Sequence, residues 1–326
     1  MSKDIFVFVE CKNGSIRKVS FELLSKAKEI SEKLSSIVYA VIIGSDVEAA
    51  ANNLQEFADK VIVVNNEKLK NYRWDTYIHV MEQLIRKYTP YAVFGASTVT
   101  GKDIFPRLAA KFNGAIISDA VGAVLEGEII KIKKPLFGGK IISWVACKDD
   151  STFFVTFRPN SFSVEKRPSN GELIYEALDV AEDARINLVR VDKAESKKVD
   201  LQEADFIICG GRGMKGPENF QILEEIAEIM EGRVGASRAV VDSKWRDYDD
   251  QIGKSGKTVS PKLYIGCGVS GALHHTMGMD TSKVIVAVNK DPNALIFQYA
   301  DYGIVDDLFD VLPLLKEGLL KTKQEV

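Results

Sequence analysis

The sequence predicts a two-domain α/β protein, and three observations carry this prediction. The chain has 326 residues, more than one hydrophobic core usually organises. Its first half alternates short β-rich runs with amphipathic helical stretches, a pattern typical of parallel strands with helices on both faces. This alternation begins again after a polar stretch near residue 193. We therefore expect an N-terminal domain, residues 1–193, with an open, mostly parallel sheet, and a C-terminal domain, residues 194–326, with a doubly wound parallel sheet.

The elements of the first domain follow from its hydrophobic periodicity. Strands are expected at Ile5–Glu10, Ile37–Ile43, Lys60–Val64 and Tyr91–Ala96. Helices are expected at Phe21–Leu34, Val47–Phe57, Trp74–Tyr88 and Lys102–Phe112. The pattern then changes to strands separated by turns, at Glu128–Lys133, Lys140–Cys147 and Thr152–Phe157. This change predicts an antiparallel extension of the parallel sheet.

A charged stretch rich in Pro, Ser and Asn runs from Arg158 to Asp200, interrupted by Ile186–Val191, and its polar run Lys193–Lys198 marks the expected domain boundary. In the second domain, strands are expected at Phe206–Cys209, Ala239–Val241, Lys262–Gly266, Lys283–Val288 and Tyr302–Val305. Helices are expected at Asn219–Met230, Gly271–Met277 and Leu308–Leu320. A doubly wound sheet binds its ligand at the carboxyl ends of its strands, so the turns at those ends are the candidate site.

Composition excludes several classes of function. The 43 Lys+Arg and 46 Asp+Glu residues give a net charge of -3, which offers no electrostatic reason to bind nucleic acid or an anionic membrane. The four cysteines form no C-x-x-C pair, which argues against a zinc site or an iron–sulfur cluster. We see neither a signal or transit peptide nor the roughly 20 apolar residues of a membrane span. A cytoplasmic protein with small-molecule or protein partners is expected.

The turn after the first strand of the second domain is rich in glycine. Gly211, Gly213 and Gly216 satisfy the G-x-G-x-x-G pattern, and Asp242 lies roughly where a dinucleotide-binding fold places its ribose-binding acid. The same glycines could equally serve a strand-to-helix turn that needs positive φ angles. Both interpretations stay open on this motif alone.

Three further turns carry groups that suit a phosphate-bearing nucleotide. In Gly266–Ala272, Ser270 and the N–H groups of Gly271 and Ala272 could grip a pyrophosphate at a helix N-terminus. The loop Gln251–Lys257 has two lysines, a hydroxyl and two glycines, and an exposed turn is its simplest explanation. Asn289 and Asp291 could pair with ribose or adenine, or cap the next helix.

The chain has three histidines, His79, His274 and His275, and two of them are adjacent. Neighbouring positions on a helix point about 100° apart, and no third His or Cys has ligand spacing, so a metal site is not expected. A serine hydrolase is not expected either, because Gly268–Ala272 lacks the last glycine of the nucleophile elbow and no later His could act as base.

Several long segments resemble the alpha subunits of electron transfer flavoproteins. In the second domain these are GGRGMKGPEN, VGASRAVVD, QIGKSGKTV, LYIGCGVSGALHHTMGM, VAVNKDP and DYGIVDDLF, in the order and spacing of that family. In the first domain they are GASTVTGKDIFPRLAAKF and the region around Asp119. The resemblance therefore extends over essentially the whole chain.

The resemblance implies that the second domain is an FAD-binding domain. It implies that Arg212 lies by the cofactor, that Ser237, Ser270 and Gly271 bind phosphates, and that Arg238 stands over the isoalloxazine ring. It implies that Ser255 reaches the N5 edge and that His275 faces the N1/C2 carbonyl. Asn289, Lys290 and Asp307 would serve the ribose and adenine end, and the other candidate cofactor-binding residues are Gln251, Gly253, Lys254, Gly268, His274 and Leu308.

These assignments agree with flavin chemistry, because a reduced flavin gains negative charge near N1 and C2=O, where a cation or hydrogen-bond donor stabilises it. Many family members have Gln-Thr where this chain has Lys254-Ser255, and Gln where it has His274. We therefore expect Lys254 and His274 to shift the flavin potential. No residue is expected to make or break bonds in a substrate.

The resemblance also implies partners. A smaller beta subunit would complete the particle, and acyl-CoA dehydrogenases would exchange electrons with it. Some family members split electron pairs from NADH, with ferredoxin as one acceptor, and this sequence leaves that open. The first domain, which has no cofactor turns, is the candidate partner-binding face. The alternative function is an NAD-dependent dehydrogenase that uses Gly211, Gly213, Gly216 and Asp242.

Overall fold

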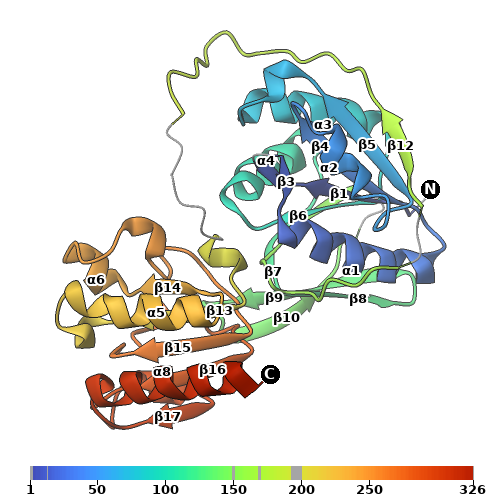
Figure 1. Cartoon of the computed structure of the whole chain (residues 1–326). Coiled ribbons are helices and arrows are strands. Elements are labelled where there is room, and N and C mark those ends of the chain that lie inside the picture. The colour runs from blue at the N-terminus through green and yellow to red at the C-terminus, as the bar shows by residue number, and fades with distance from the viewer. Residues whose placement is uncertain (1–2, 13, 149–150, 168–169, 192–199, 326) are drawn as a thin grey trace. The chain divides into compact units, whose positions relative to one another are not determined.

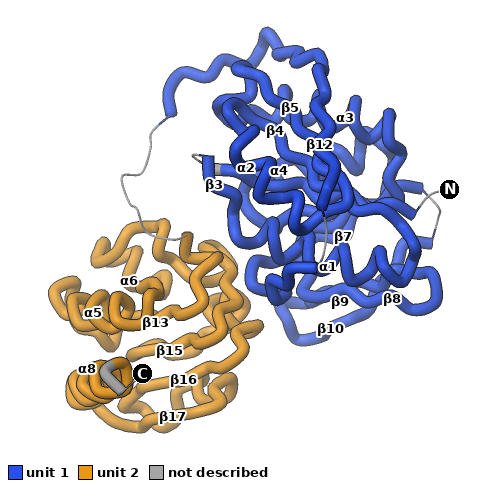
Figure 2. The backbone as a smooth tube through the Cα atoms, turned by 45° about the vertical axis from the view of Figure 1, so that its right-hand side comes forward, with its two compact units in different colours: residues 1–194 blue, residues 195–326 orange. Residues whose placement is uncertain are grey.

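The computed structural model describes residues 3–12, 14–148, 151–167, 170–191 and 200–325. The chain divides into two compact units, residues 1–194 and 195–326 (Figure 2). Each unit contains a parallel sheet with helices, so the predicted α/β class is confirmed. The predicted boundary between residues 193 and 194 and the run Lys193–Lys198 lie outside the described residues.

The first unit is built on a seven-stranded sheet with the order β12-β5-β4-β1-β6-β11-β7, in which every neighbouring pair is parallel (Figure 1). Its strands are β1 (Ile5–Val9), β4 (Val38–Gly44), β5 (Lys60–Asn65), β6 (Ala92–Ala96), β7 (Ile116–Ala120), β11 (Phe153–Phe157) and β12 (Glu172–Tyr175). A short hairpin, β2 (Cys11–Lys12) and β3 (Ser15–Ile16), follows β1.

Helices cover both faces of this sheet because its central strands are apolar on both sides. Ile5, Val7 and Val9 pack on the face covered by α1 and α2, whereas Phe6 and Phe8 pack on the face covered by α3 and α4. The helices are α1 (Lys18–Leu34), α2 (Glu48–Asn52), α3 (Trp74–Tyr88) and α4 (Val99–Lys111), with the 3-10 turn η1 (Glu67–Leu69).

Antiparallel strands are present, as predicted, but they form a separate three-stranded sheet in the order β10-β9-β8. These strands are β8 (Gly122–Glu126), β9 (Ile129–Leu136) and β10 (Ile141–Val145). The edge strand β7 leads into β8 after Val121, so this sheet continues from the edge of the parallel one. The expectation that Thr152–Phe157 belongs to the antiparallel part is wrong, because β11 lies between β6 and β7 and is parallel to both.

The edge strand β12 lies in the charged stretch Arg158–Asp200, where the sequence analysis predicted no strand. Its residues pair in parallel with β5, with Glu172 opposite Lys60. Between β11 and β12 the chain therefore passes from one side of the seven-stranded sheet to the opposite edge. The polar composition of the flanking residues hid this strand, although Leu173 packs against the core.

The second unit is built on a five-stranded parallel sheet in the order β14-β13-β15-β16-β17. Its strands are β13 (Phe206–Gly210), β14 (Arg233–Ala236), β15 (Leu263–Cys267), β16 (Val284–Val288) and β17 (Tyr302–Ile304). Counted along the chain, the order is 2-1-3-4-5, which reverses direction between β13 and β15. Open parallel sheets bind ligands at this reversal point, outside the carboxyl ends of the strands.

Two helices, α5 (Gln221–Ile229) and α8 (Leu308–Glu325), pack on one face of this sheet with Phe206 and Ile208. Loops and turns cover the other face through Ile252, Val259 and Ile296. The remaining helical elements are the short α6 (Arg238–Asp242) and α7 (Leu273–Thr276), with the 3-10 turns η2 (Leu201–Glu203), η3 (Arg212–Met214), η4 (Glu218–Phe220), η5 (Tyr248–Asp250) and η6 (Leu295–Gln298).

Two predictions for this unit are corrected. The predicted strand Ala239–Val241 is helical, and the strand of this region is β14 (Arg233–Ala236), which precedes it. The predicted helix Gly271–Met277 is shorter, because only Leu273–Thr276 is helical. Among the described residues, no helix is long and apolar enough to cross a membrane.

Candidate functional site

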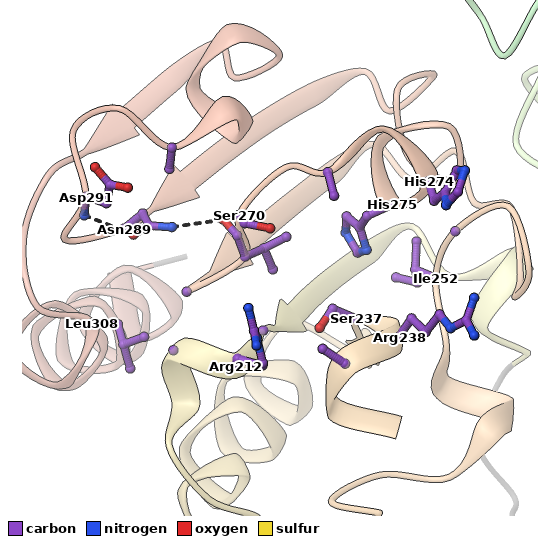
Figure 3. A pocket seen from close by; sticks show the side chains of 18 of the residues that line it. Arg212, Ser237, Arg238, Ile252, Ser270, His274, His275, Asn289, Asp291 and Leu308 are labelled. Atoms are coloured by element: carbon purple, nitrogen blue, oxygen red, sulfur yellow. Dashed lines mark hydrogen bonds between the residues drawn. The ribbon is translucent and has the colours of Figure 1, made fainter. Parts of the chain in front are cut away.

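A cavity of about 830 Å³ lies at the carboxyl ends of β13, β14, β15 and β16, at the reversal point of the sheet (Figure 3). Most of the predicted cofactor-binding residues line it: Arg212, Ser237, Arg238, Gly253, Ser255, Gly268, Ser270, His274, His275, Asn289, Lys290, Asp307 and Leu308. Gln251, Lys254 and Gly271 do not. Turns that are far apart in sequence are thus brought together by the parallel arrangement of the strands.

The glycines after β13 allow two turns to pack closely. The N–H of Gly211 donates to the Cys267 carbonyl at 2.9 Å, and the N–H of Gly213 donates to the Gly268 carbonyl at 3.2 Å. A Cβ on Gly211 would lie 2.2 Å from the Gly268 carbonyl oxygen. A Cβ on Gly213 would lie 2.7 Å from the Cα of Gly268. These glycines are therefore required by the contact between the β13 and β15 turns.

Gly271 is needed for backbone reasons and does not face the cavity. It has a φ of +80°, in the region that favours glycine, and a Cβ there would lie 2.1 Å from the Ile296 nitrogen. The turn after β15 thus packs against η6 through Gly271, while Ser270 and Ala272 line the cavity.

Three polar side chains at the cavity have no partner among the residues that the structure describes. The side chains of Arg212, Ser237 and Ser270 make no hydrogen bond or ion pair with any residue that the structure describes. Arg212 and Ser270 are also exposed. A guanidinium and two hydroxyls without partners are suited to bind phosphate oxygens.

Arg238 is the first residue of α6, directly after Ser237. Its Nε donates to Asp242 Oδ2 at 3.3 Å, and both side chains are about two-thirds exposed, at 66% and 63%. Both also line the cavity. Asp242 is the last residue of α6, so it faces Arg238 across one helical turn. The predicted strand Ala239–Val241 is part of this helix, so Asp242 does not come directly after a strand.

The loop Gln251–Lys257 is braced around Ser255. The Gln251 side chain donates to Ser255 Oγ at 3.1 Å, and the Tyr248 hydroxyl donates to the Ser255 carbonyl at 2.5 Å. The Lys254 backbone N–H donates to the His274 carbonyl at 2.7 Å, which joins this loop to α7. Gln251 is buried and acts behind the cavity wall, whereas the Lys254 side chain is exposed.

The adjacent histidines of α7 differ in burial, and their rings diverge (Figure 3). His274 is exposed, whereas His275 is only 7% exposed and its Nε2 lies 2.7 Å from the Tyr264 hydroxyl. Its Nδ1 is buried and has no hydrogen-bond partner in the described part of the chain. Burial lowers the pKa of His275 to about 4, against a smaller opposing effect of the Ile252 backbone. His275 is therefore neutral at pH 7 here, so it offers a hydrogen bond and no charge.

Asn289 braces the turn after β16. Its Nδ2 donates to the Val269 carbonyl at 2.9 Å, and its Oδ1 accepts from the Asp291 N–H at 3.0 Å. Asp291 in turn accepts from the Asn293 N–H at 2.9 Å. The amide nitrogen and the amide oxygen of Asn289 thus both hold the turns in place. The neighbouring residue, Lys290, is exposed and lines the cavity.

Asp307 caps α8 at the far end of the cavity. Its Oδ1 accepts from the Phe309 N–H at 3.0 Å, and this bond, with the nearby Lys215, lowers the pKa of the Asp307 carboxyl. Lys215 lies 3.6 Å from Asp307 Oδ2 and 4.4 Å from the Phe309 ring centre. Leu308 provides an apolar wall beside them.

Some lining residues were not predicted to bind a cofactor: Lys215, Ala239, Ile252, Val269 and Ala294. Ala272 and Asp291, which the sequence analysis named as candidate contacts, also line the cavity, and Ile252 lies in the loop Gln251–Lys257. Tyr264, which is buried behind His275, gave no signal, because a tyrosine inside an apolar strand looks like core. No group of three His, Cys, Asp or Glu side chains among the described residues could hold a metal ion.

Comparison with known proteins gives a consistent result. A family model described as electron transfer flavoprotein domain matches residues 5–201, and one described as electron transfer flavoprotein FAD-binding domain matches residues 200–280. The chain is 40% identical over 326 residues to the electron transfer flavoprotein subunit alpha of Thermoanaerobacterium thermosaccharolyticum, covering 98% of this chain and 99% of that protein.

Two further relatives cover nearly the whole chain. The electron transfer flavoprotein subunit alpha of Bacillus subtilis is 42% identical over 319 residues, covering 97% of each chain. A protein of Anaerotignum propionicum named acryloyl-CoA reductase electron transfer subunit beta is 31% identical over 357 residues, covering 98% of this chain and 96% of that one. The chain belongs to the alpha-subunit family of electron transfer flavoproteins.

Proposed function

We propose that this chain holds FAD in the cavity of its second unit and serves as the alpha subunit of a heterodimeric electron carrier. The observation that carries the proposal is the convergence of four glycine-rich or polar turns on one cavity at the reversal point of the sheet. Its volume of about 830 Å³ lies within the range of about 300–1,000 Å³ typical of small-molecule sites.

The residues present fit an FAD. Arg212, Ser237 and Ser270 offer donors that have no partner in the described part of the chain, and such donors suit a diphosphate. The buried Nδ1 of His275 is an orphaned polar atom, and orphaned atoms of this kind usually mark a missing partner. When bound, FAD would supply the redox chemistry, and the protein would supply orientation and electrostatics.

Each part of the cofactor has proposed contacts. Arg212, Ser237 and Ser270 would bind the phosphates, whereas Lys290, Asp307 and Leu308 would serve the ribose and adenine end. Arg238, Ser255 and His275 would face the ring system, where a cation and a hydrogen-bond donor stabilise added negative charge. Gly271, Gln251 and Asn289 would act indirectly, by holding the turns that carry these groups.

The alternative, an NAD-dependent dehydrogenase, is less well supported. Its fingerprint needs a helix that opens at the glycine turn, but the turn leads into the 3-10 segment η3, and α5 begins only at Gln221. Gly211 and Gly213 serve the packing of two turns. Asp242 lies on a helix and pairs with Arg238, so it is not placed as a ribose-binding acid after a strand.

The proposed partners extend beyond the chain. The relatives named as alpha subunits support a beta subunit that completes the particle. The relative named as an acryloyl-CoA reductase electron transfer subunit supports an acyl-CoA dehydrogenase-type enzyme as electron donor or acceptor. NADH and ferredoxin would join them if the complex bifurcates electrons. We place the complex in the cytoplasm, where the four free thiols would stay reduced.

The purified alpha–beta complex tests the proposal. We expect a yellow protein whose extracted cofactor is FAD, and no tight binding of NADH by the alpha subunit. Arg212→Gln should weaken FAD retention, whereas Lys262→Gln, an exposed change beside the start of β15, should not. A colourless complex that binds NADH in this cavity would support the dehydrogenase instead.

A further inference from the structure

Behind the cavity wall, a buried hydrogen bond links strand β15 to His275. Tyr264 lies in β15 and is fully buried, and its hydroxyl is 2.7 Å from His275 Nε2. Cys209, on the neighbouring strand β13, is also fully buried, and its thiol donates to the Gly210 carbonyl with the sulfur 4.0 Å from that oxygen. Tyr264 was not among the predicted site residues, and the proposed function gives its hydroxyl no role. A buried hydroxyl that bonds to a histidine of the cavity needs an explanation.

The direction of the hydrogen bonds follows from the protons available. Burial raises the pKa of Tyr264 well above its ordinary value, and burial raises the pKa of the Cys209 thiol to about 12. Both groups therefore keep their protons at pH 7. The Cys209 thiol donates to the Gly210 carbonyl. Among the described residues, the Tyr264 hydroxyl has His275 Nε2 as its hydrogen-bond partner, so the tyrosine proton is donated to Nε2, which must then be the unprotonated nitrogen of the ring.

A neutral imidazole carries its proton on the other nitrogen once Nε2 accepts a hydrogen bond. That nitrogen, Nδ1, has no hydrogen-bond partner in the described part of the chain, and the His275 ring lines the cavity. The geometry is therefore consistent with one tautomer, with the proton on Nδ1.

We propose that Tyr264 is a positioning residue that donates to His275 Nε2 and so keeps the His275 proton on Nδ1, for donation to an acceptor of the bound cofactor. The last step rests on the proposed function, because it needs the cofactor, whereas the tautomer itself is a property of the protein. Tyr264 would thus decide whether His275 meets the cofactor as a donor or as an acceptor.

The tautomer can be measured by ¹⁵N NMR of the ring nitrogens in the alpha–beta complex stripped of flavin. The chain has three histidines, so His79→Gln and His274→Gln assign the alpha-subunit signals. We expect a protonated Nδ1 and an unprotonated Nε2 for His275. Wild-type protein with the proton on Nε2 would overturn the proposal, whether or not any Tyr264 variant folds.

The substitution Tyr264→Phe removes only the hydroxyl. It should lower the Nδ1–H to Nε2–H ratio about tenfold, as expected for the loss of one hydrogen bond. The matched control is Tyr302→Phe, which removes a hydroxyl from the exposed strand β17 and should leave the ratio unchanged. An unchanged ratio in a folded Tyr264→Phe variant would sink the proposal.

The reduction potential of the FAD-loaded complex gives a second readout. Tyr264→Phe should shift the potential when His275 is present and have no effect in a His275→Gln background, since the tyrosine acts through the histidine. Equal shifts in both backgrounds would show a merely structural role. If no flavin binds at all, the proposed function fails, and the tautomer measured without flavin still decides the role of Tyr264.

Discussion

Arg238 and His275 lie at the same cavity but differ in electrostatic character. Arg238 is exposed and forms an ion pair with Asp242, whereas His275 is buried and neutral. An exposed ion pair of this kind contributes little to stability. We therefore expect the positive field at the proposed ring end of the cavity to come from Arg238, with His275 contributing a directed hydrogen bond.

The neutral state of His275 predicts a pH dependence of stability. Its pKa is lowered to about 4 in the folded protein, from an ordinary value of 6.5. As the pH falls from 6.5 to 4, the unfolded chain takes up a proton that the folded chain does not, so the free energy of unfolding decreases, by up to about 3 kcal/mol. Urea unfolding of flavin-free protein at pH 7 and pH 4.5 measures this loss.

The control for that experiment is His275→Gln, which keeps a hydrogen-bonding group but cannot titrate. As the pH falls, the unfolding free energy of wild type should decrease relative to that of the variant, because only wild type has the titrating imidazole. A difference that does not change with pH would mean that His275 titrates alike in the folded and unfolded chains.

The polar side chains near the proposed ring end of the cavity predict an effect on the flavin potential. His274 lines the cavity, whereas the Lys254 side chain is exposed and does not. We expect His274→Gln and Lys254→Gln each to change the potential, with the larger change for His274. Redox titration of the FAD-loaded complex measures both, and identical potentials in all three proteins would contradict the expectation.

Much of the site could be predicted at the residue level, because turns at the ends of parallel strands must meet at one edge of a sheet. Arg212, Ser237 and Ser270 lie where this rule places them. The direction in which a side chain points does not follow from that rule. Gly271 and Lys254 lie in the right turns yet do not face the cavity, and Tyr264 was hidden by its apolar strand.

At the scale of elements, the turn after β15 depends on Gly271. Gly271→Ala should lower the free energy of unfolding by about 2 kcal/mol or more, because the residue has a positive φ and a Cβ would meet the backbone of Ile296. Chemical denaturation measures the change. The matched control is Gly318→Ala in α8, where the Cβ meets nothing within 4 Å and should stabilise the helix by about 0.5–1 kcal/mol. Equal effects of the two substitutions would refute this account.

Element predictions succeeded where periodicity was strong and failed where runs were short. The helices α1 and α3 and the central strands β1, β4 and β6 lie close to their predicted positions. The run Ala239–Val241 has β-branched residues typical of a strand, but a three-residue run cannot distinguish strand from helix. The true strand, β14, contains Gly235, whose small size lets Ile252 pack against it.

At the scale of the molecule, the two units have separate cores. One pair of buried clusters lies within residues 5–180 and another within residues 201–312. We therefore expect two unfolding transitions in calorimetry of the chain. Leu24→Ala in α1 should lower the midpoint temperature of only one transition, and Leu223→Ala in α5 that of only the other. Each substitution should reduce the unfolding free energy of its own unit by about 2–5 kcal/mol. One transition that both variants shift alike would exclude independent units.

The late position of β12 in the chain has a consequence during synthesis. The strand β5 is complete at residue 65, but its outer neighbour is made only when residues 172–175 have been translated. Until then, a nascent sheet would present β5 to the ribosome surface and to other polypeptides as a bare row of backbone donors and acceptors, which invites wrong pairing. This exposure would last roughly as long as the ribosome takes to translate the stretch between the two strands.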